Sequence, residues 1–315
     1  MARILITDRT DPVLQETLEA AGHLVAVDTH VSYDTLLQTI GQYDALVVRS
    51  KINIDKNFLD HARHLRCIGR VGAGMETIDV EYAESLGIRC LNSPEGNRVA
   101  VGEHALGLLL ALLDNIARAD AEVRRGLWQR EANRGWELKG RTVGIIGFGN
   151  MGSAFAQRLQ GFECDIIAYD RYKPAGYAPA YVQEVSLEEL QERAEVLSLH
   201  VPLTPETHHM VDRQFINGLR HPFFLINTSR GAVVNTPDLV EALEKQQILG
   251  AALDVIEYED MSRDGLDLEH LPTAFQYLID SPRTVLTPHV AGWTVESHYK
   301  LAKVLADKMI HTLTH

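Results

Sequence analysis

The sequence predicts an α/β fold built from two doubly wound parallel sheets, one in each of two domains. Two series of short apolar runs alternate with amphipathic helical segments, a pattern typical of βαβ units. The chain has 315 residues. At about 100–200 residues per domain, this length also indicates two domains.

The first series supplies five expected strands. Each is a short run of mostly apolar residues: Ile4–Thr7, Leu24–Asp28, Ala45–Val48, Cys67–Val71 and Ile88–Leu91. The intervening segments Pro12–Ala21 and Tyr33–Ile40 have the apolar spacing of amphipathic helices.

A second series, which we expect to form the other sheet, begins at Thr142. It contains six runs: Thr142–Gly147, Asp165–Asp170, Val196–His200, Phe223–Asn227, Leu249–Asp254 and Thr284–Leu286. A long helical pattern from Arg98 to Arg125 separates the two series, with Asn97 as its expected N-cap and Gly126 just past its end. Another helical pattern, Glu296 to Thr312, follows the last run.

The composition is that of an acidic globular protein. Hydrophobic residues make up 45% of the chain, and the formal net charge is −13. This charge disfavours nucleic acid and anionic membrane surfaces as partners. The longest apolar run, Ala105 to Leu113, is shorter than the roughly 20 residues that cross a bilayer.

The cysteines and the amino-terminal segment favour a cytoplasmic location. Cys67, Cys90 and Cys164 are scattered and form no CxxC pair, as expected of reduced thiols. The chain begins with a strand pattern, so we expect no signal peptide. Among the 14 histidines are the neighbours His208 and His209, but no HxH or HExxH arrangement occurs, and we expect no metal site.

A glycine motif opens the second series. Gly147, Gly149 and Gly152 form a GxGxxG that an apolar strand enters and a helical pattern leaves, with Asn150 and Met151 inside it. This context is typical of a dinucleotide-binding Rossmann unit. The first glycine allows a tight turn, the second lets the backbone approach a pyrophosphate, and the third lets helix and strand pack closely. The pyrophosphate would lie at the helix N-terminus.

An acidic residue ends the next strand and indicates which dinucleotide binds. Asp170 lies 18 residues after Gly152, where a carboxylate accepts hydrogen bonds from the adenosine ribose. A carboxylate there repels the additional phosphate of NADP, so we expect NAD as cofactor. Arg171 could contact that phosphate, which leaves use of both cofactors open.

Three later strand ends carry candidate catalytic residues. Arg230, Glu259 and His289 each follow a predicted strand, and ligands of open α/β sheets bind beyond the carboxyl ends of strands. An arginine can bind a carboxylate with two hydrogen bonds, and a histidine beside a carboxylate can exchange a proton with a hydroxyl group. Spacing alone leaves other interpretations open: a structural ion pair for Arg230, a solvated acid for Glu259 and a core or capping role for His289.

At these residues the sequence resembles the D-isomer-specific 2-hydroxyacid dehydrogenases over nearly the whole chain. The similar segments are Arg70-Val71-Gly72-Ala73-Gly74 with Ile78-Asp79, Gly96-Asn97 through Glu103-His104, the glycine motif, His200-Val201-Pro202-Leu203-Thr204 with Thr207, and the segments of Arg230, Asp254, Glu259 and His289.

The resemblance implies an enzyme that transfers a hydride between NAD and a small 2-hydroxy or 2-keto acid. It implies a flavodoxin-like substrate domain from residues 1–97 and 288–315, an NAD-binding Rossmann domain from residues 98–287, and a homodimer. Arg230 would bind substrate, Glu259 and His289 would be the acid/base pair, and Asp254 would hold the nicotinamide carboxamide. Further contacts would come from His200, Thr207 and Thr228 to the cofactor, and from Gly72, Ala73 and Gly74 to the substrate.

Within the family, Val48-Arg49-Ser50 is most similar to members that oxidise D-3-phosphoglycerate. Arg49 and Ser50 are therefore expected to bind substrate, with Arg49 meeting a phosphate, although it could be merely an exposed arginine at a strand end. We expect Arg130 or Arg134 to add a second positive charge. The sequence ends at residue 315, so we do not expect the carboxy-terminal regulatory domain that many such enzymes carry. The 30 positions from Glu259 to His289 also exceed the expected length and suggest an insertion around Met261–Asp280.

Two other functions stay open at the level of sequence. One is a reductase of glyoxylate, hydroxypyruvate or another 2-keto acid, which Arg49, Ser50 and Asp170 disfavour. The other is a non-catalytic protein that senses NAD(H), which the acidic composition and the lack of an appended interaction segment disfavour.

Overall fold

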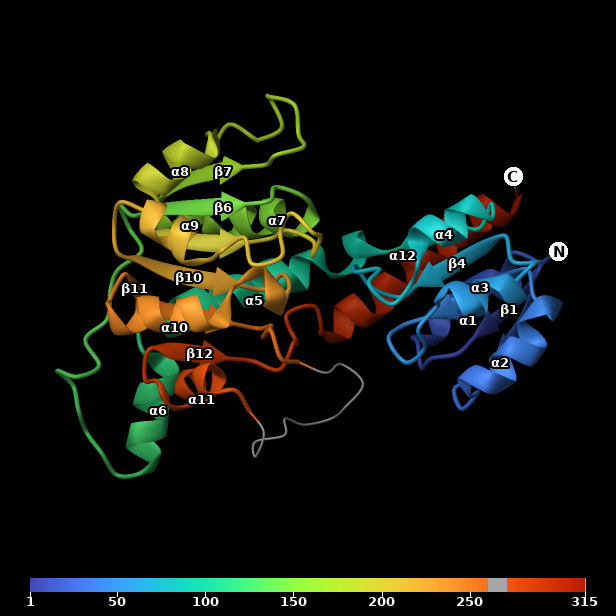
Figure 1. Cartoon of the computed structure of the whole chain (residues 1–315), viewed down its shortest axis with the longest axis horizontal. Helices are drawn as coiled ribbons and strands as arrows, with labels where there is room; N and C mark the ends of the chain where they lie inside the picture. The colour runs from blue at the N-terminus through green and yellow to red at the C-terminus, as the bar shows by residue number, and fades with distance from the viewer. Residues whose placement is uncertain (260–270, 315) are drawn as a thin grey trace. The chain divides into compact units, whose positions relative to one another are not determined.

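The computed structural model describes residues 1–259 and 271–314, and these fold into two compact units (Figure 1). Unit 1 consists of Met1–Arg98 and Trp293–His315, and unit 2 of Val99–Gly292. The second boundary falls at Trp293, where the sequence suggested residue 288, so His289 belongs to unit 2.

Unit 1 is built on a five-stranded parallel sheet with the strand order β2-β1-β3-β4-β5. This is the flavodoxin-like order, as expected. The strands are β1 (Arg3–Ile6), β2 (Leu24–Val27), β3 (Ala45–Val48), β4 (Cys67–Arg70) and β5 (Arg89–Asn92).

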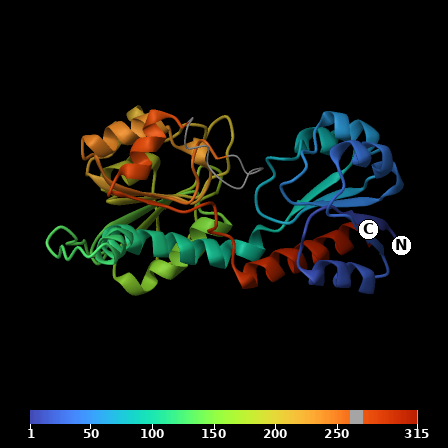
Figure 2. The ribbon, with the colours of Figure 1, turned by 90° about the horizontal axis from the view of Figure 1, so that it is seen from below.

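Helices cover both faces of the unit 1 sheet (Figure 2). On one face lie α1 (Pro12–Ala20) and α12 (Val295–Thr314); on the other lie α2 (Tyr33–Thr39), the 3-10 helix η1 (Ile40–Gln42), α3 (Lys56–His61) and α4 (Val80–Ser85). Most of these helices begin at an Asp or Ser whose side chain accepts a backbone N–H of the first turn, as Asp11 and Ser32 do.

Unit 2 contains a seven-stranded parallel sheet with the order β12-β11-β10-β9-β6-β7-β8. Counted from β6, this is the Rossmann order 3-2-1-4-5-6 with one more strand, and it reverses between β6 and β9. The strands are β6 (Thr142–Ile146), β7 (Asp165–Tyr169), β8 (Gln183–Glu184), β9 (Val196–Leu199), β10 (Phe223–Asn227), β11 (Ile248–Leu253) and β12 (Thr284–Leu286).

Two apolar layers enclose the unit 2 sheet (Figure 2). One layer packs against α5 (Pro94–Leu113) and α7 (Asn150–Leu159), which the 3-10 helix η2 (Gln160–Phe162) follows. The other packs against α8 (Leu187–Arg193), α9 (Arg213–Gly218), the 3-10 helix η3 (Gly231–Val233), α10 (Thr236–Glu244) and α11 (Thr273–Asp280).

The prediction of one long helix from Arg98 to Arg125 is wrong in two respects. It begins at Pro94, so Asn97 lies inside it and is not its N-cap. It also ends at Leu113, because Asn115 adopts the left-handed conformation with φ 53°, and a second helix, α6 (Ile116–Arg124), follows at an angle of 62°. Gly126, with φ 80°, ends α6 as expected.

Three further findings concern the sequence predictions. All eleven predicted strands are present, but the short β8 was missed because its two residues, Gln183 and Glu184, are polar. In the described ranges, no single helix is long and apolar enough to span a membrane, and α5 with α6 passes that test only as a bent pair. The suggested insertion around Met261–Asp280 lies partly outside the described residues, and its last part forms α11.

Candidate active site

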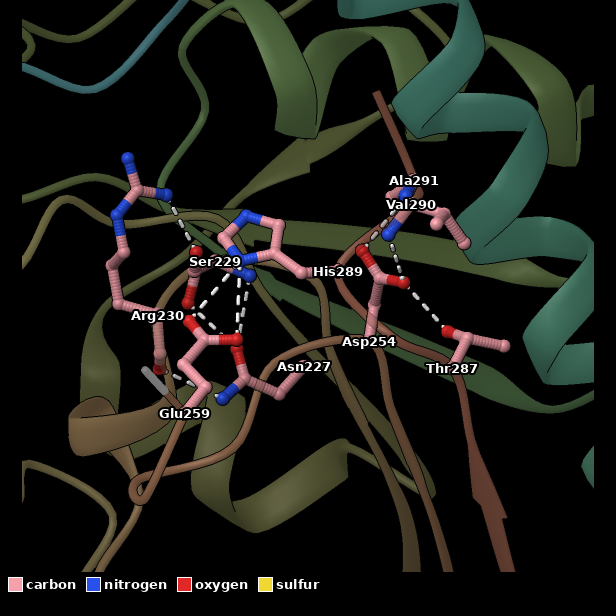
Figure 3. Close-up of polar contacts among 9 residues, drawn as sticks. All are labelled: Asn227, Ser229, Arg230, Asp254, Glu259, Thr287, His289, Val290 and Ala291. Atoms are coloured by element: carbon pink, nitrogen blue, oxygen red, sulfur yellow. Dashed lines mark hydrogen bonds and ion pairs between the residues drawn. The ribbon is translucent and has the colours of Figure 1, made fainter. Parts of the chain in front are cut away.

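Glu259 and His289 meet at the carboxyl edge of the unit 2 sheet, on the loops that follow β11 and β12 (Figure 3). Nδ1 of His289 lies 3.1 Å from both carboxylate oxygens of Glu259. The two side chains are 30% and 23% exposed, so solvent screens the pair only in part. With Nδ1 facing the carboxylate, Nε2 is the ring nitrogen left for proton exchange with a ligand.

Arg230 lies on the neighbouring loop, after β10 (Figure 3). Its Nη1 donates to the Ser229 carbonyl at 2.6 Å, and its own carbonyl accepts from Nδ2 of Asn227 at 2.9 Å. The next residue, Gly231, is pressed against the Glu259 loop: a Cβ there would lie 2.0 Å from the carbonyl of Ile256. Only glycine permits this close approach of the Arg230 and Glu259 loops.

Asp254, at the end of β11, anchors the loop that carries His289 (Figure 3). Its buried carboxylate accepts from Oγ1 of Thr287 at 2.6 Å and from the backbone N–H groups of Val290 at 2.9 Å and Ala291 at 2.8 Å. Burial raises the pKa of this carboxyl, but these bonds and one from His104 outweigh it and hold the pKa below its usual value. Contact with the nicotinamide carboxamide stays a prediction; anchoring the loop is a role that the sequence did not reveal.

The backbone of His289 itself is strained. Its φ is 54°, in the left-handed region that residues other than glycine rarely adopt. The N–H of His289 donates to the Asp254 carbonyl at 2.8 Å, which holds this conformation. Such strain is common at functional sites, and here it directs the imidazole toward Glu259.

The glycine turn has the geometry that a pyrophosphate needs. Gly147 has φ 86°, and a Cβ at Gly152 would lie 2.1 Å from the Gly147 carbonyl. A Cβ at Gly149 would meet no atom within 4 Å, so the space before this residue is open, and no side chain caps the first turn of α7. These features fit a dinucleotide phosphate bound by backbone N–H groups.

Asp170 is fixed beside that turn. Its Oδ2 accepts from the N–H of Phe148 at 2.8 Å and its Oδ1 from the N–H of Tyr172 at 3.1 Å. Each oxygen keeps a lone pair for a ribose hydroxyl. The two residues that follow Asp170 both contact the carboxylate of Glu206, Tyr172 through its hydroxyl group and Arg171 through its guanidinium. Arg171 is therefore paired with an acid.

Three other residues expected to contact the cofactor, His200, Thr207 and Thr228, make different contacts in the structure. Oγ1 of Thr207 donates to the Pro202 carbonyl at 2.6 Å and so stabilises a turn. The ring of His200 packs on Phe155, and burial lowers its pKa to about 3, which keeps it neutral. In the described part of the chain, Nδ1 of His200 and Oγ1 of Thr228 are buried without a partner, so both could pair with a ligand.

The substrate residues expected in unit 1 lie at the ends of β3 and β4. The Arg49 guanidinium stacks 3.6 Å from the Trp293 ring centroid, and Nε of Arg70 donates to the Arg49 carbonyl at 3.1 Å. Burial and the Arg70 charge lower the pKa of Arg49 to about 10, so it remains a cation at neutral pH. Ser50 is half-buried beside them.

The loop after β4 accommodates this arrangement. Gly72 has φ 155°, a backbone conformation that favours glycine, and a Cβ there would lie 1.7 Å from the Arg70 guanidinium, which would have to move away. The Ala73 carbonyl accepts from Nδ2 of Asn92 at 2.6 Å, which holds the loop that continues through Gly74.

Sequence reasoning missed several residues of these clusters. His104 donates toward Thr287 and Asp254 from α5; it lies in a segment that resembles the family, but the sequence indicated no role for it. Arg70 and Trp293 lie 21 and more than 200 residues from Arg49, and no local pattern links them. Among the described residues, no group of three His, Cys, Asp or Glu side chains could hold a metal.

The parallel sheets, the glycine turn with Asp170 and the His–Glu pair define a dinucleotide-dependent oxidoreductase. Residues 106–291 match the family described as D-isomer specific 2-hydroxyacid dehydrogenase, NAD binding domain. The chain belongs to this family of NAD-dependent enzymes, which act on small 2-hydroxy and 2-keto acids. This finding sets aside the alternative of a non-catalytic sensor.

Characterised relatives match almost the whole chain. It is 33% identical over 311 residues to a hydroxypyruvate reductase of Thermotoga maritima, covering 99% of this chain and 98% of that protein. It is 35% identical over 311 residues to a D-3-phosphoglycerate dehydrogenase of Methanocaldococcus jannaschii, covering 98% of this chain but 57% of that protein. The chain therefore spans little more than half the length of the second relative.

Solved structures of similar proteins share the fold. A Thermus thermophilus protein is 31% identical with a TM-score of 0.81, over 99% of this chain and 97% of that one. A D-lactate dehydrogenase from Treponema pallidum is 27% identical with a TM-score of 0.82, over 100% of this chain and 96% of that one.

Proposed function

We propose that the protein oxidises D-3-phosphoglycerate at C2 with NAD and catalyses the reverse reduction of 3-phosphohydroxypyruvate. The family establishes the reaction class, and one observation supports a phosphorylated substrate. Arg49 and Arg70 place two guanidinium groups side by side at the carboxyl edge of the unit 1 sheet. Among the described residues, the Arg49 guanidinium forms no ion pair; the nearby Asp8 carboxylate offsets burial and the Arg70 charge only in part, so an anionic ligand would stabilise this partly buried cation.

The residues of unit 2 account for the chemistry at C2. NAD, when bound at the glycine turn, supplies the hydride acceptor. Arg230 binds the C1 carboxylate and orients the carbon to be oxidised. Nε2 of His289 takes the proton of the C2 hydroxyl, and Glu259 stabilises the imidazolium that results. In the reverse direction, the same imidazolium returns the proton to the alkoxide oxygen.

Reduction of hydroxypyruvate is the second candidate. The relative named hydroxypyruvate reductase matches this chain over 98% of its own length, whereas the phosphoglycerate dehydrogenase relatives extend well beyond the match. Hydroxypyruvate differs from 3-phosphohydroxypyruvate only in lacking the phosphate. The two candidates therefore share Arg230, Glu259 and His289 and differ in their need for Arg49 and Arg70.

Steady-state kinetics with both substrates and both cofactors distinguish the candidates. The proposal expects kcat/KM for 3-phosphohydroxypyruvate with NADH to exceed that for hydroxypyruvate by about 100-fold, in line with a charged pair worth about 3 kcal/mol. Turnover of hydroxypyruvate without turnover of the phosphorylated acid would replace the first candidate by the second. Glyoxylate and pyruvate complete the panel.

We further propose a homodimer that forms through α6 and the segment after it. Apolar side chains are exposed there within unit 2: Ile116, Val123, Leu127 and Trp128, the last with 78% of its surface accessible. A second copy of the chain would bury them. One chain has a mass of 35.1 kDa, and light scattering should give twice this value. Trp128→Glu should shift the protein toward the monomer.

A further inference from the structure

We propose that His209 and Glu257 form a positioning pair that fixes the loop carrying Glu259. Nε2 of His209 lies 2.6 Å from Oε1 of Glu257, although 48 residues separate them. His209 lies on the loop after β9, and Glu257 lies on the loop after β11, two residues before Glu259. Neither residue has a role in the reaction described above.

The Glu257 carboxylate is held from two sides. While His209 contacts Oε1, the N–H of Thr236 at the start of α10 donates to Oε2 at 3.1 Å. Burial raises the pKa of Glu257, but the hydrogen bonds from Thr236 and His209 outweigh it and hold the pKa below its usual value. The carboxylate is therefore ionised at neutral pH, and its side chain is 17% exposed.

The neighbours of His209 determine which ring nitrogen carries the proton. Asn235 caps α10 by accepting the N–H of Asp238 on its Oδ1 at 3.1 Å, so its Nδ2 is the atom that faces the imidazole. That amide donates to Nδ1 of His209 at 3.3 Å. Nε2 then carries the hydrogen and donates it to Glu257.

The backbone of His209 is held in a conformation that residues other than glycine rarely adopt. Its φ is 52°, in the left-handed region, and its N–H donates to the Ala232 carbonyl at 2.8 Å. An unfavourable backbone at a non-glycine residue persists where the surrounding structure holds it. Here it directs the imidazole at the loop of Glu259.

The pair acts on catalysis through the turn that follows Glu257. The N–H of Glu259 donates to the Ile256 carbonyl at 3.3 Å, so residues 256–259 form one tight turn. The place of the Glu257 carboxylate therefore determines where Glu259 stands beside His289. A catalytic group misplaced by about 1 Å can cost about 100-fold in rate.

Single variants test the pair with the 2-keto acid that gives the best turnover. His209→Leu removes the donor, and His209→Asn tolerates the left-handed backbone but is too short to reach Glu257. Each should lower kcat by about 10–50-fold while the Kd for NADH stays within about 2-fold. His209→Gln keeps a donor at the same reach and should retain activity within about 3-fold. The matched control is His221→Leu, because His221 is exposed in the same unit and has no side-chain hydrogen bond among the described residues, whereas the ring of His208 lies 4.0 Å from that of His209.

A double-mutant cycle with Glu259→Gln distinguishes positioning from general stability. If His209 acts through Glu259, adding His209→Leu to Glu259→Gln should cost less than about 3-fold in kcat. Full additivity of the two losses would overturn the proposal, as would near-native kcat in both His209→Leu and His209→Asn. Since any family substrate serves in this assay, the outcome does not depend on phosphoglycerate being the natural one.

Discussion

Nδ1 of His289 lies 3.1 Å from both carboxylate oxygens of Glu259, although 30 residues separate them in the chain. The approach depends on groups beyond the pair itself. Asp254 holds the His289 loop through two backbone N–H groups, and the absence of a side chain at Gly231 lets the Glu259 loop lie against the Arg230 turn. The acid/base pair thus rests on contacts among three strand-end loops.

Replacing the histidine tests its role as proton acceptor. His289→Ala should lower kcat/KM by about 10²–10⁴-fold, the range expected for loss of a general acid–base group. Affinity for NADH should barely change, because the glycine turn is intact. Fluorescence titration of NADH and stopped-flow turnover measure the two effects separately. A near-native rate would remove His289 from the mechanism.

The open space before Gly149 predicts a selective loss of cofactor binding. Gly149→Ala should leave the melting temperature within about 2 °C, since its Cβ meets no atom within 4 Å. It should weaken NADH binding by about 10-fold or more, because the methyl group occupies the approach of the pyrophosphate. Gly161→Ala, at another unobstructed glycine, is the control and should change neither quantity. Unaltered NADH binding in Gly149→Ala would place the pyrophosphate elsewhere.

The carboxylate of Asp170 should determine the preference for NAD. Asp170→Ala removes the charge that repels an additional phosphate, and it leaves Arg171 and Lys173 nearby, the latter donating from Nζ to the Phe148 carbonyl at 2.6 Å. We expect the ratio of kcat/KM for NADH over NADPH to fall by about 10-fold or more, equivalent to about 1.4 kcal/mol. Parallel assays with both cofactors measure this ratio. If it is unchanged, discrimination depends on other residues.

The arginine pair of unit 1 should matter for one substrate class only. Arg49→Gln should raise KM for 3-phosphohydroxypyruvate by about 10–100-fold, because a charge-assisted bond contributes about 1.5–3 kcal/mol. The constants for hydroxypyruvate should change by less than about 3-fold. Arg63→Gln, at an exposed arginine of the same unit, is the control. Equal losses for both acids would mean that Arg49 does not recognise the phosphate.

Local patterns predicted the elements, and contacts between distant segments account for what they missed. Short apolar runs located eleven strands, and the GxGxxG context located the cofactor turn, because both signals are local. The break at Asn115 was missed because apolar spacing continues across it. The His209–Glu257 and Arg49–Trp293 contacts join residues with no local relation, so only the folded chain reveals them.

A crystal structure of the complex with NADH and a non-reactive 2-keto acid analogue tests the central claim most directly. The analogue's carboxylate should receive two hydrogen bonds from Arg230, and its carbonyl oxygen should lie about 2.6–3.2 Å from Nε2 of His289. Nδ1 of that imidazole should remain on Glu259. An analogue bound away from these three side chains, or an imidazole turned from Glu259, would contradict the account.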